Sequence, residues 1–227
     1  MATEAVPQDQ ANELRVELPQ QRPPAPTELV VVSRPAADSI ADPGPLGLAA
    51  FALTTFILSL FNAGMVDTPG LTHIVLPMAL VYGGVIQILA GMWEFKKNNT
   101  FGALVFSSYG AFWVGLAVME WLVLEEVPKA DVLTAKGIYL LAWTIPTVYM
   151  LIGSFRTSKV LAGVFSVLIV TFLLLMFGRF NPDTTWLLEW GGYLGIVTAF
   201  GAWYASAAGL LNGMYGRTVA PMFPFKK

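Results

Sequence analysis

Six stretches of about 20 predominantly apolar residues run through this sequence, and they constrain its fold more than any other feature. A helix of that length crosses the hydrocarbon core of a bilayer and satisfies its own backbone hydrogen bonds there. Composition agrees, because only 12% of the residues are charged, whereas soluble domains carry about a quarter. We therefore predict an all-α integral membrane protein with six transmembrane helices per protomer. The predicted spans are residues 46–66, 74–95, 101–124, 138–155, 160–178 and 190–212.

The residue inventory excludes several classes of function. The chain has no cysteine, which removes disulfides, thiolate metal ligands and cysteine nucleophiles. Its one histidine, His73, falls in a predicted loop without a Ser/His/Asp set or a cluster of metal ligands. A net charge of -2 with scattered basic residues indicates no nucleic-acid partner. We predict no enzyme activity, no metal and no cofactor.

The N-terminal region differs from the rest of the chain. Residues 1–45 hold eight of the fifteen prolines, and Met1 to Gln10 has neither the basic nor the apolar region of a signal peptide. Such a segment cannot bury enough apolar surface to fold alone. The sequence predicts a disordered, proline-rich tail over residues 1–41, a six-helix transmembrane domain over residues 42–221, and a short C-terminal tail over residues 222–227.

The basic residues predict an orientation. With six spans, ten of the thirteen lysines and arginines fall on the side of the two termini, and cytoplasmic loops are the ones enriched in such residues. Both termini, and hence the tail, are therefore predicted to be cytoplasmic. The three on the other side are Lys129, Lys136 and Arg179.

Polar side chains follow one face of each of the first three spans. A polar group in hydrocarbon costs a few kcal/mol unless it meets a partner or water, so these faces are predicted to line an internal pathway. For any single residue an alternative stays open, since a hydroxyl can bond its own helix and Gln87 can join two helices. Each residue of a helix advances by about 100°, which defines the three faces. They are Phe51, Thr55, Ser59 and Asn62 in the first span, Gly83, Gln87, Gly91 and Glu94 in the second, and Tyr109, Trp113, Leu116 and Glu120 in the third.

Charges near the spans suggest how an anion is handled. Glu94 either pairs with Lys96 or Lys97 or relays a proton, and Glu120 lies either at the headgroup level or on the pathway. No lysine or arginine is predicted inside a span, which excludes a fixed cationic anion site. An anion would then be held by hydroxyls, amides and helix N-termini.

Small residues in the last span predict its packing. Gly191, Gly195 and Ala199 recur every fourth residue, and Gly201, Ala205 and Gly209 repeat that spacing. Such ridges let helices approach closely, either within one chain or between copies of it.

Several ordered motifs carry a family resemblance. The segment Asp42, Pro43, Gly44, Pro45, Leu46, Gly47, Leu48 is similar to the Asn-Pro-Ala-Pro-Leu-Gly-Leu signature of the acetate uptake transporter (AceTr) family. That family includes the enterobacterial acetate/succinate permease and the fungal ammonia/acetate transport proteins. Asp42 and Gly44 depart from the signature. Further matches are Tyr82-Gly83-Gly84, Gln87, Ala90-Gly91, Glu94, Asn99-Thr100-Phe101-Gly102, Ser108-Tyr109-Gly110, Phe112-Trp113 and Tyr215-Gly216-Arg217-Thr218.

The resemblance implies a function and a set of site residues. It implies a homo-hexamer in the cell (plasma) membrane, with a pathway in each protomer for acetate, related monocarboxylates and sometimes succinate, as a channel or a proton symporter. It also implies a constriction formed by Phe51, Tyr109 and Leu168, with Ala202 bearing on solute size. The expected substrate path is Asp42 to Leu48, Thr55, Gln87, Glu94, Asn99, Thr100 and Ala202.

Two other functions are compatible with the residues alone. One is a membrane sensor or scaffold that binds partners through its tail. The other is a channel for a neutral solute such as ammonia.

Overall fold

The computed structural model describes residues 40–66, 68 and 70–225, so nearly all of the predicted N-terminal tail lies outside it, as do residues 226–227. Within the described ranges, six helices are long and apolar enough to cross a membrane, which confirms the predicted all-α fold. The elements are α1 (Gly44–Asn62), η3 (Leu71–Ile74), α2 (Val75–Pro77), η4 (Met78–Ile86), α3 (Gln87–Lys96), α4 (Thr100–Val118), η5 (Met119–Val123), α5 (Val132–Ser154), α6 (Lys159–Phe180) and α7 (Thr185–Tyr215).

Helix ends are determined by capping and depart from the apolar runs. The α4 and α6 helices begin where Asn99 Oδ1 accepts from Gly102 N at 3.2 Å and Ser158 Oγ accepts from Leu161 N at 3.2 Å. The α5 helix begins six residues before its predicted start, and α6 continues past its predicted end. Lys136 and Arg179 therefore lie inside membrane-spanning helices, so the prediction that no basic residue lies inside a span is wrong. Averaged hydropathy identifies the apolar centre of a helix. It misses the terminal turns that contain lysine or arginine, although the long side chains of these residues can reach polar surroundings from inside the helix.

The second and third spans each contain a π-helical segment. Residues Met78–Ile86 form η4, and Met119–Val123 form η5. A π-helix has more residues per turn than an α-helix, so the 100° rule does not carry a face through it. Gly83 accordingly packs against α1, because a β carbon there would lie 2.5 Å from Thr54 Oγ1.

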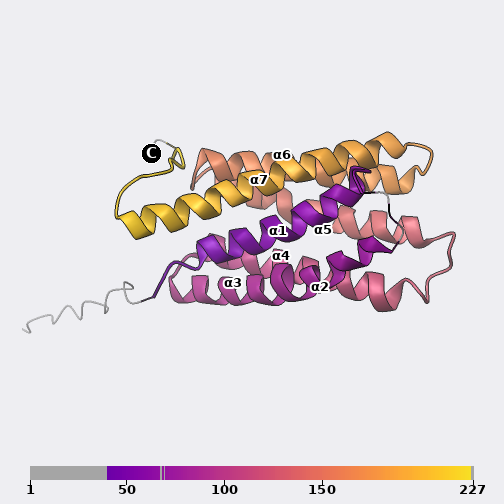
Figure 1. Ribbon diagram of the computed structural model, residues 1–227, viewed down its shortest axis with the longest axis horizontal. Coiled ribbons are helices and arrows are strands. Elements are labelled where there is room, and N and C mark those ends of the chain that lie inside the picture. Colours follow the sequence, from indigo (N-terminus) through magenta and orange to yellow (C-terminus); the bar gives the residue numbers. More distant parts are fainter. Residues whose placement is uncertain (1–39, 67, 69, 226–227) are drawn as a thin grey trace, which may run out of the picture. The chain divides into compact units, whose positions relative to one another are not determined.

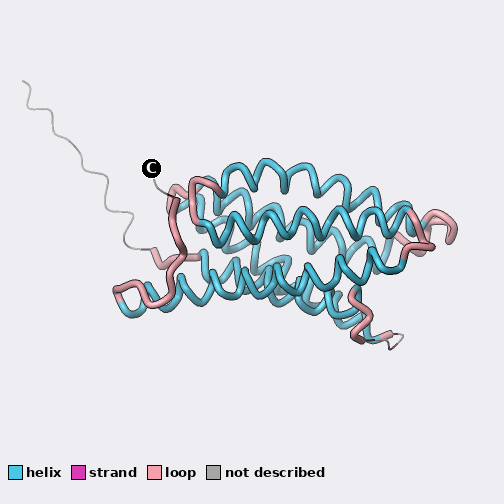
Figure 2. Tube along the Cα trace, turned by 90° about the horizontal axis from the view of Figure 1, so that it is seen from above, coloured by secondary structure: helices cyan, strands magenta, loops and turns pink. Residues whose placement is uncertain are grey.

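The helices pack as neighbours along their lengths (Figures 1 and 2). The α7 helix packs on α1 and α6, α5 packs on α6, and α3 packs on α4. The small-residue ridges of α7 make these contacts within the chain, since Gly191 meets Leu175 of α6 and Gly209 meets Pro45 of α1. The start of α1 and the end of α7 lie at the same end of the bundle (Figure 1).

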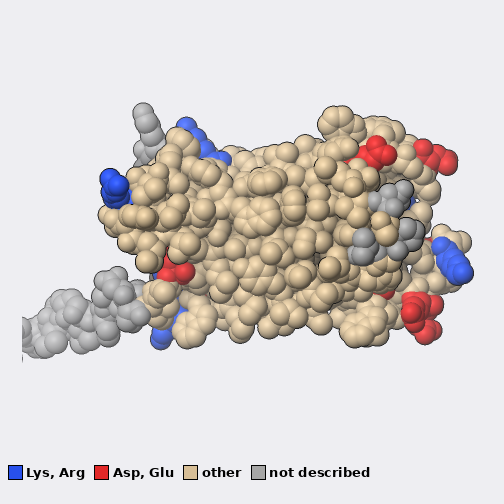
Figure 3. All heavy atoms as spheres, in the orientation of Figure 1, with Lys and Arg blue, Asp and Glu red and all other residues tan. Residues whose placement is uncertain are grey.

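Charged side chains gather at the two ends of the bundle (Figure 3). On the face shown, the surface between the ends is uncharged. Many large apolar side chains of the helices are exposed, among them Val81, Ile145 and Phe200. In water such a surface would be unstable, whereas in lipid it is solvated. The protein is therefore a multi-pass membrane protein.

The crossing of α7 with the end of α1 allows a stability prediction. A β carbon on Gly192 would overlap the backbone N and Cα of Ala63, which cannot move aside as a flexible side chain would. Gly192→Leu is expected to destabilise the folded protein by about 3 kcal/mol or more. Thermal unfolding in detergent measures this, with Gly213→Leu on the same helix as the control, because nothing lies within 4 Å of a β carbon there. Equal unfolding temperatures for the two variants would contradict the packing described.

Candidate functional site

Linked cavities cross the interior of the bundle. A cavity of about 240 Å³, the proximal cavity, extends from Asp42 at the start of α1 to Phe51 and Leu168. A smaller one of about 40 Å³ shares Phe51 and Leu168 with it and extends to Asn62 at the end of α1. The two cavities therefore meet at one layer of side chains.

The same line continues to the opposite end of the bundle. A cavity of about 60 Å³ shares Leu58 and Asn62 with the preceding one. It joins a cavity of about 330 Å³, the distal cavity, with which it shares Asn62, Lys136 and Arg179. The cavities thus form a series from one end of the bundle to the other, and the smallest of them borders Phe51.

Phe51 and Leu168 border both the proximal cavity and the next one, and Tyr109, which borders the proximal cavity, packs on Phe51 beside them. Their exposed fractions are 6%, 2% and 2%, and the rings of Phe51 and Tyr109 meet edge to face with centroids 5.3 Å apart. The Tyr109 hydroxyl hydrogen-bonds Thr147 Oγ1 at 2.8 Å, which fixes the position of the ring. This layer is apolar apart from one satisfied hydroxyl.

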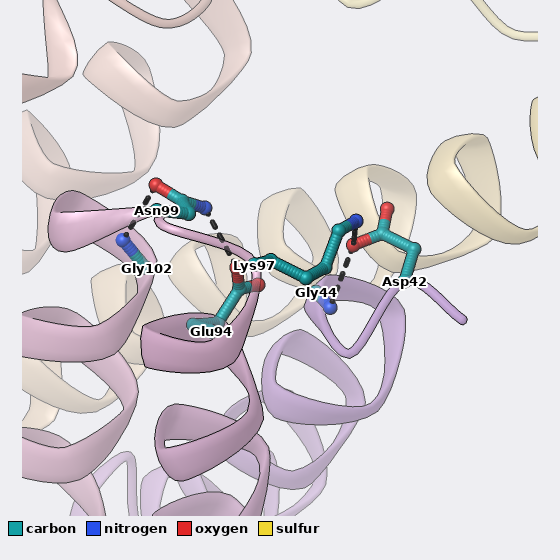
Figure 4. A network of polar contacts seen from close by, with 6 residues as sticks. All are labelled: Asp42, Gly44, Glu94, Lys97, Asn99 and Gly102. Atoms are coloured by element: carbon teal, nitrogen blue, oxygen red, sulfur yellow. Dashed lines mark hydrogen bonds and ion pairs between the residues drawn. The ribbon is translucent and has the colours of Figure 1, made fainter. Parts of the chain in front are cut away.

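Two polar pairs lie at the mouth of the proximal cavity (Figure 4). Glu94, only 2% exposed, accepts a hydrogen bond from Asn99 Nδ2 at 2.8 Å. Lys97 forms an ion pair with Asp42 at 3.1 Å, and the same Asp42 oxygen accepts from Gly44 N at 3.2 Å. The predicted pairing of Glu94 with Lys96 or Lys97 is therefore wrong. The reversal at residues 97–99 brings the Asn99 amide back over the carboxylate and directs Lys97 toward α1.

The other predicted residues fall into three groups. Leu48, Thr55 and Gln87 line the cavities, and the hydroxyl of Thr55 and both amide atoms of Gln87 have no hydrogen-bond partner among the described residues. Pro45 and Gly47 make packing contacts between helices. The Pro45 carbonyl accepts a hydrogen bond from Ser206 Oγ at 2.6 Å, and the Phe106 ring packs on Gly47. Outside the lining of these four cavities lie Pro43, Leu46, Thr100 and the fully buried Ala202.

The faces predicted for α1 and α4 line this series along its length. On α1, Phe51, Thr55, Ser59 and Asn62 all border a cavity, and on α4 and η5, Tyr109, Trp113, Leu116 and Glu120 do the same. Glu120 does not face the headgroups alone, because Lys136 Nζ lies 2.8 Å from its carboxylate.

The α6 helix supplies lining that sequence reasoning missed. Leu161, Val164 and Phe165 border the proximal cavity together with Leu168, and Leu175 borders the next one. Ser166 is exposed and Thr171 borders the cavity of about 40 Å³, so the two polar residues in the middle of this helix lie on different sides and form no continuous polar face. The spacing of three and four residues from Leu161 to Leu175 is the signal that could have found it.

Comparison with known proteins identifies the family. A model described as the GPR1/FUN34/yaaH family matches residues 27–227. The chain belongs to the GPR1/FUN34/yaaH family. Membership confirms the resemblance seen in the segment from Asp42 to Leu48 and in the motifs that follow it.

Relatives in the GPR1/FUN34/yaaH family carry transport names. The succinate-acetate/proton symporter SatP of Escherichia coli K12 is 39% identical over 186 residues, which cover 81% of this chain and 95% of SatP. Acetate permease A of Emericella nidulans is 38% identical, covering 83% of this chain and 68% of the permease. The ammonia transport outward protein 2 of Saccharomyces cerevisiae is 38% identical, covering 75% of this chain and 61% of that protein.

One solved structure has the same fold as this chain. The bacterial acetate channel SatP matches with a TM-score of 0.74 and 37% sequence identity, over 81% of this chain and 99% of that one.

Proposed function

We propose that this protein conducts acetate, related small monocarboxylates and the dicarboxylate succinate across a membrane through a pathway within each protomer. One observation carries the proposal. Linked cavities run from Asp42 to Arg179 and are interrupted at the Phe51, Tyr109 and Leu168 layer. The names of the bacterial and fungal relatives support the same solute class.

The proposed route assigns a role to each predicted site residue. Acetate enters the proximal cavity past Asp42 to Leu48, Glu94, Asn99 and Thr100, and then meets the Gln87 amide. It crosses the constriction of Phe51, Tyr109 and Leu168 and continues past Thr55, while Ala202 of α7 bears on solute size from outside the cavity lining, through the packing around the constriction. Acetic acid has a pKa close to that of a side-chain carboxyl, so at neutral pH the transported species is almost entirely the anion.

The proposal includes an assembly and an orientation. A homo-hexamer in the plasma membrane would cover part of the exposed apolar surface of each protomer, and both termini would be cytoplasmic. Among the described residues, the end of the bundle with the start of α1 and the end of α7 carries five basic residues, Lys96, Lys97, Arg156, Lys159 and Arg217, which supports this orientation. Residues 42–221 form the transporter domain, and residues 1–41 and 222–227 lie outside the conducting core.

Uptake of labelled acetate into proteoliposomes tests the proposal. We expect uptake above that of protein-free liposomes. Separate pH and voltage gradients distinguish the two modes, because a symporter of one proton with one anion is electroneutral and responds to pH, whereas an anion channel responds to voltage. Uptake equal to that of protein-free liposomes under both gradients would refute transport of acetate.

A neutral solute is the second candidate. The ammonia transport name of one relative and the apolar constriction favour it. Ammonia flux that acetate does not inhibit, in the absence of acetate flux, would support this candidate.

A further inference from the structure

Arg179 in the last turn of α6 is directed into the bundle. Its Nη2 lies 3.4 Å from Oδ1 of Asn62, the last residue of α1, and both residues border the distal cavity. An arginine at a helix end in a membrane protein more often extends outward to the headgroups. A side chain directed toward α1 places its charge on the line of cavities instead.

The charged residues that border the distal cavity are one carboxylate, Glu120, and two basic residues, Lys136 and Arg179, so the cavity has one excess positive charge. Lys136 and Glu120 neutralise each other in an ion pair of 2.8 Å. Within the described part of the chain, no carboxylate lies within 4.0 Å of Arg179, and its hydrogen-bond partner is the neutral Asn62 amide. Glu120 borders the same cavity and its charge acts on Arg179 from a greater distance, but it is already paired with Lys136. A guanidinium stays protonated at every accessible pH, and its planar N–H groups match the two oxygens of a carboxylate.

The surface outside this cavity has the opposite sign. Five exposed carboxylates, Glu125, Glu126, Asp131, Asp183 and Glu189, belong to the loops and helix ends on this side of the bundle. Solvent and salt screen exposed charges, whereas a charge in a cavity between helices is screened less. An anion approaching this end is therefore weakly repelled outside and attracted inside.

We propose that Arg179, positioned by Asn62, is the anion-binding residue of the distal cavity and binds the carboxylate of the solute at the end opposite the termini. The inference rests on the proposed function, since it places the second binding position of the same pathway. It replaces the expectation that hydroxyls, amides and helix N-termini alone hold the anion.

The absence of cysteine from the sequence permits a direct test of the charge. His73 is exposed and borders the distal cavity, so His73→Cys introduces a single thiol there. The thiol is modified with an anionic, sulfonate-bearing methanethiosulfonate and with a cationic, trimethylammonium-bearing one. The two modification rates are measured in the His73→Cys protein and in the same protein that also carries Arg179→Gln. Removing the charge is expected to lower the anionic-to-cationic rate ratio about fivefold. Acetate at saturating concentration is expected to slow the anionic reagent only when Arg179 is present.

Matched variants make the result specific. Lys129→Gln removes the same charge from an exposed position at the same end that borders none of the four cavities, and the ratio is expected to stay within about 1.5-fold. Arg179→Lys keeps the charge and is expected to keep the ratio, which controls for a folding defect. An unchanged ratio in Arg179→Gln, or equal protection by acetate with and without Arg179, would overturn the inference.

Flux measurements separate this inference from the proposed function. If the parent protein transports acetate and Arg179→Gln leaves the KM for acetate supplied at this end unchanged, the inference fails and the proposed function stands. If the parent transports no acetate, the proposed function fails, and the thiol rates with acetate protection still decide whether Arg179 binds carboxylates.

Discussion

Phe51→Ala is expected to increase the flux of carboxylates larger than acetate, such as butyrate, by about tenfold relative to acetate. The ring of Phe51 forms one wall of the layer between the proximal cavity and the next, and it rests edge to face on Tyr109 with centroids 5.3 Å apart. Its removal joins the two cavities. Because Tyr109 stays held by Thr147, the opening should be local and should not collapse the helices.

The measurement is the ratio of labelled butyrate flux to acetate flux in proteoliposomes. Phe56→Ala is the matched control, because Phe56 is on the same helix but packs on Phe200 and Trp203 of α7 and borders none of the four cavities. Truncation of a packed phenylalanine destabilises a protein by about 3–5 kcal/mol, so both variants are compared by thermal unfolding. The same flux ratio in both variants would show that the constriction lies elsewhere.

The part of the site that the sequence predicted best is the polar face of α1. On an apolar helix, a row of three polar residues at helical spacing favours the inside, so Thr55, Ser59 and Asn62 together indicated the inner surface. The α6 helix shows the limit of this rule. Between Leu161 and Leu175 the polar residues are Ser166, which is exposed, and Thr171, which is buried, and both bond carbonyl groups of their own helix. They form no continuous polar face, so Leu168 was reached only through the family resemblance.

Predictions from local sequence rules failed where contacts between distant parts of the chain, or the capping of helix ends, determine the structure. Hydropathy placed Lys136 and Arg179 in loops, because it does not register that capped helices continue past their apolar centres. Proximity in sequence suggested that Glu94 pairs with a neighbouring lysine, whereas Lys97 pairs with Asp42, 55 residues away. The π-helical segment Met78–Ile86 has no hydropathy signature, so the sequence did not predict it.

The side chain of Gln87 is fully buried, yet neither its Nε2 nor its Oε1 has a partner among the described residues. Leaving a buried polar group unsatisfied costs about 1–3 kcal/mol, and native proteins seldom retain such a group without a reason. Gln87 also borders the proximal cavity, next to the constriction. An amide N–H that faces this cavity without a partner is available to a carboxylate oxygen passing through.

Gln87→Met is therefore expected to stabilise the folded protein and to impair transport. Methionine has a similar length and no amide, so the unfolding free energy should rise by about 1 kcal/mol while acetate flux falls at least about tenfold. Thermal unfolding in detergent and flux in proteoliposomes measure the two effects on one preparation.

Ser107→Ala provides the comparison. The Ser107 hydroxyl is likewise buried and without a partner in the described part of the chain, but it packs against Gly91 between α3 and α4 and borders none of the four cavities. Its removal should bring a similar small gain in stability with unchanged flux. If Gln87→Met transports acetate as the parent does, the amide serves only to pack the bundle, and the carboxylate must be held elsewhere in the proximal cavity.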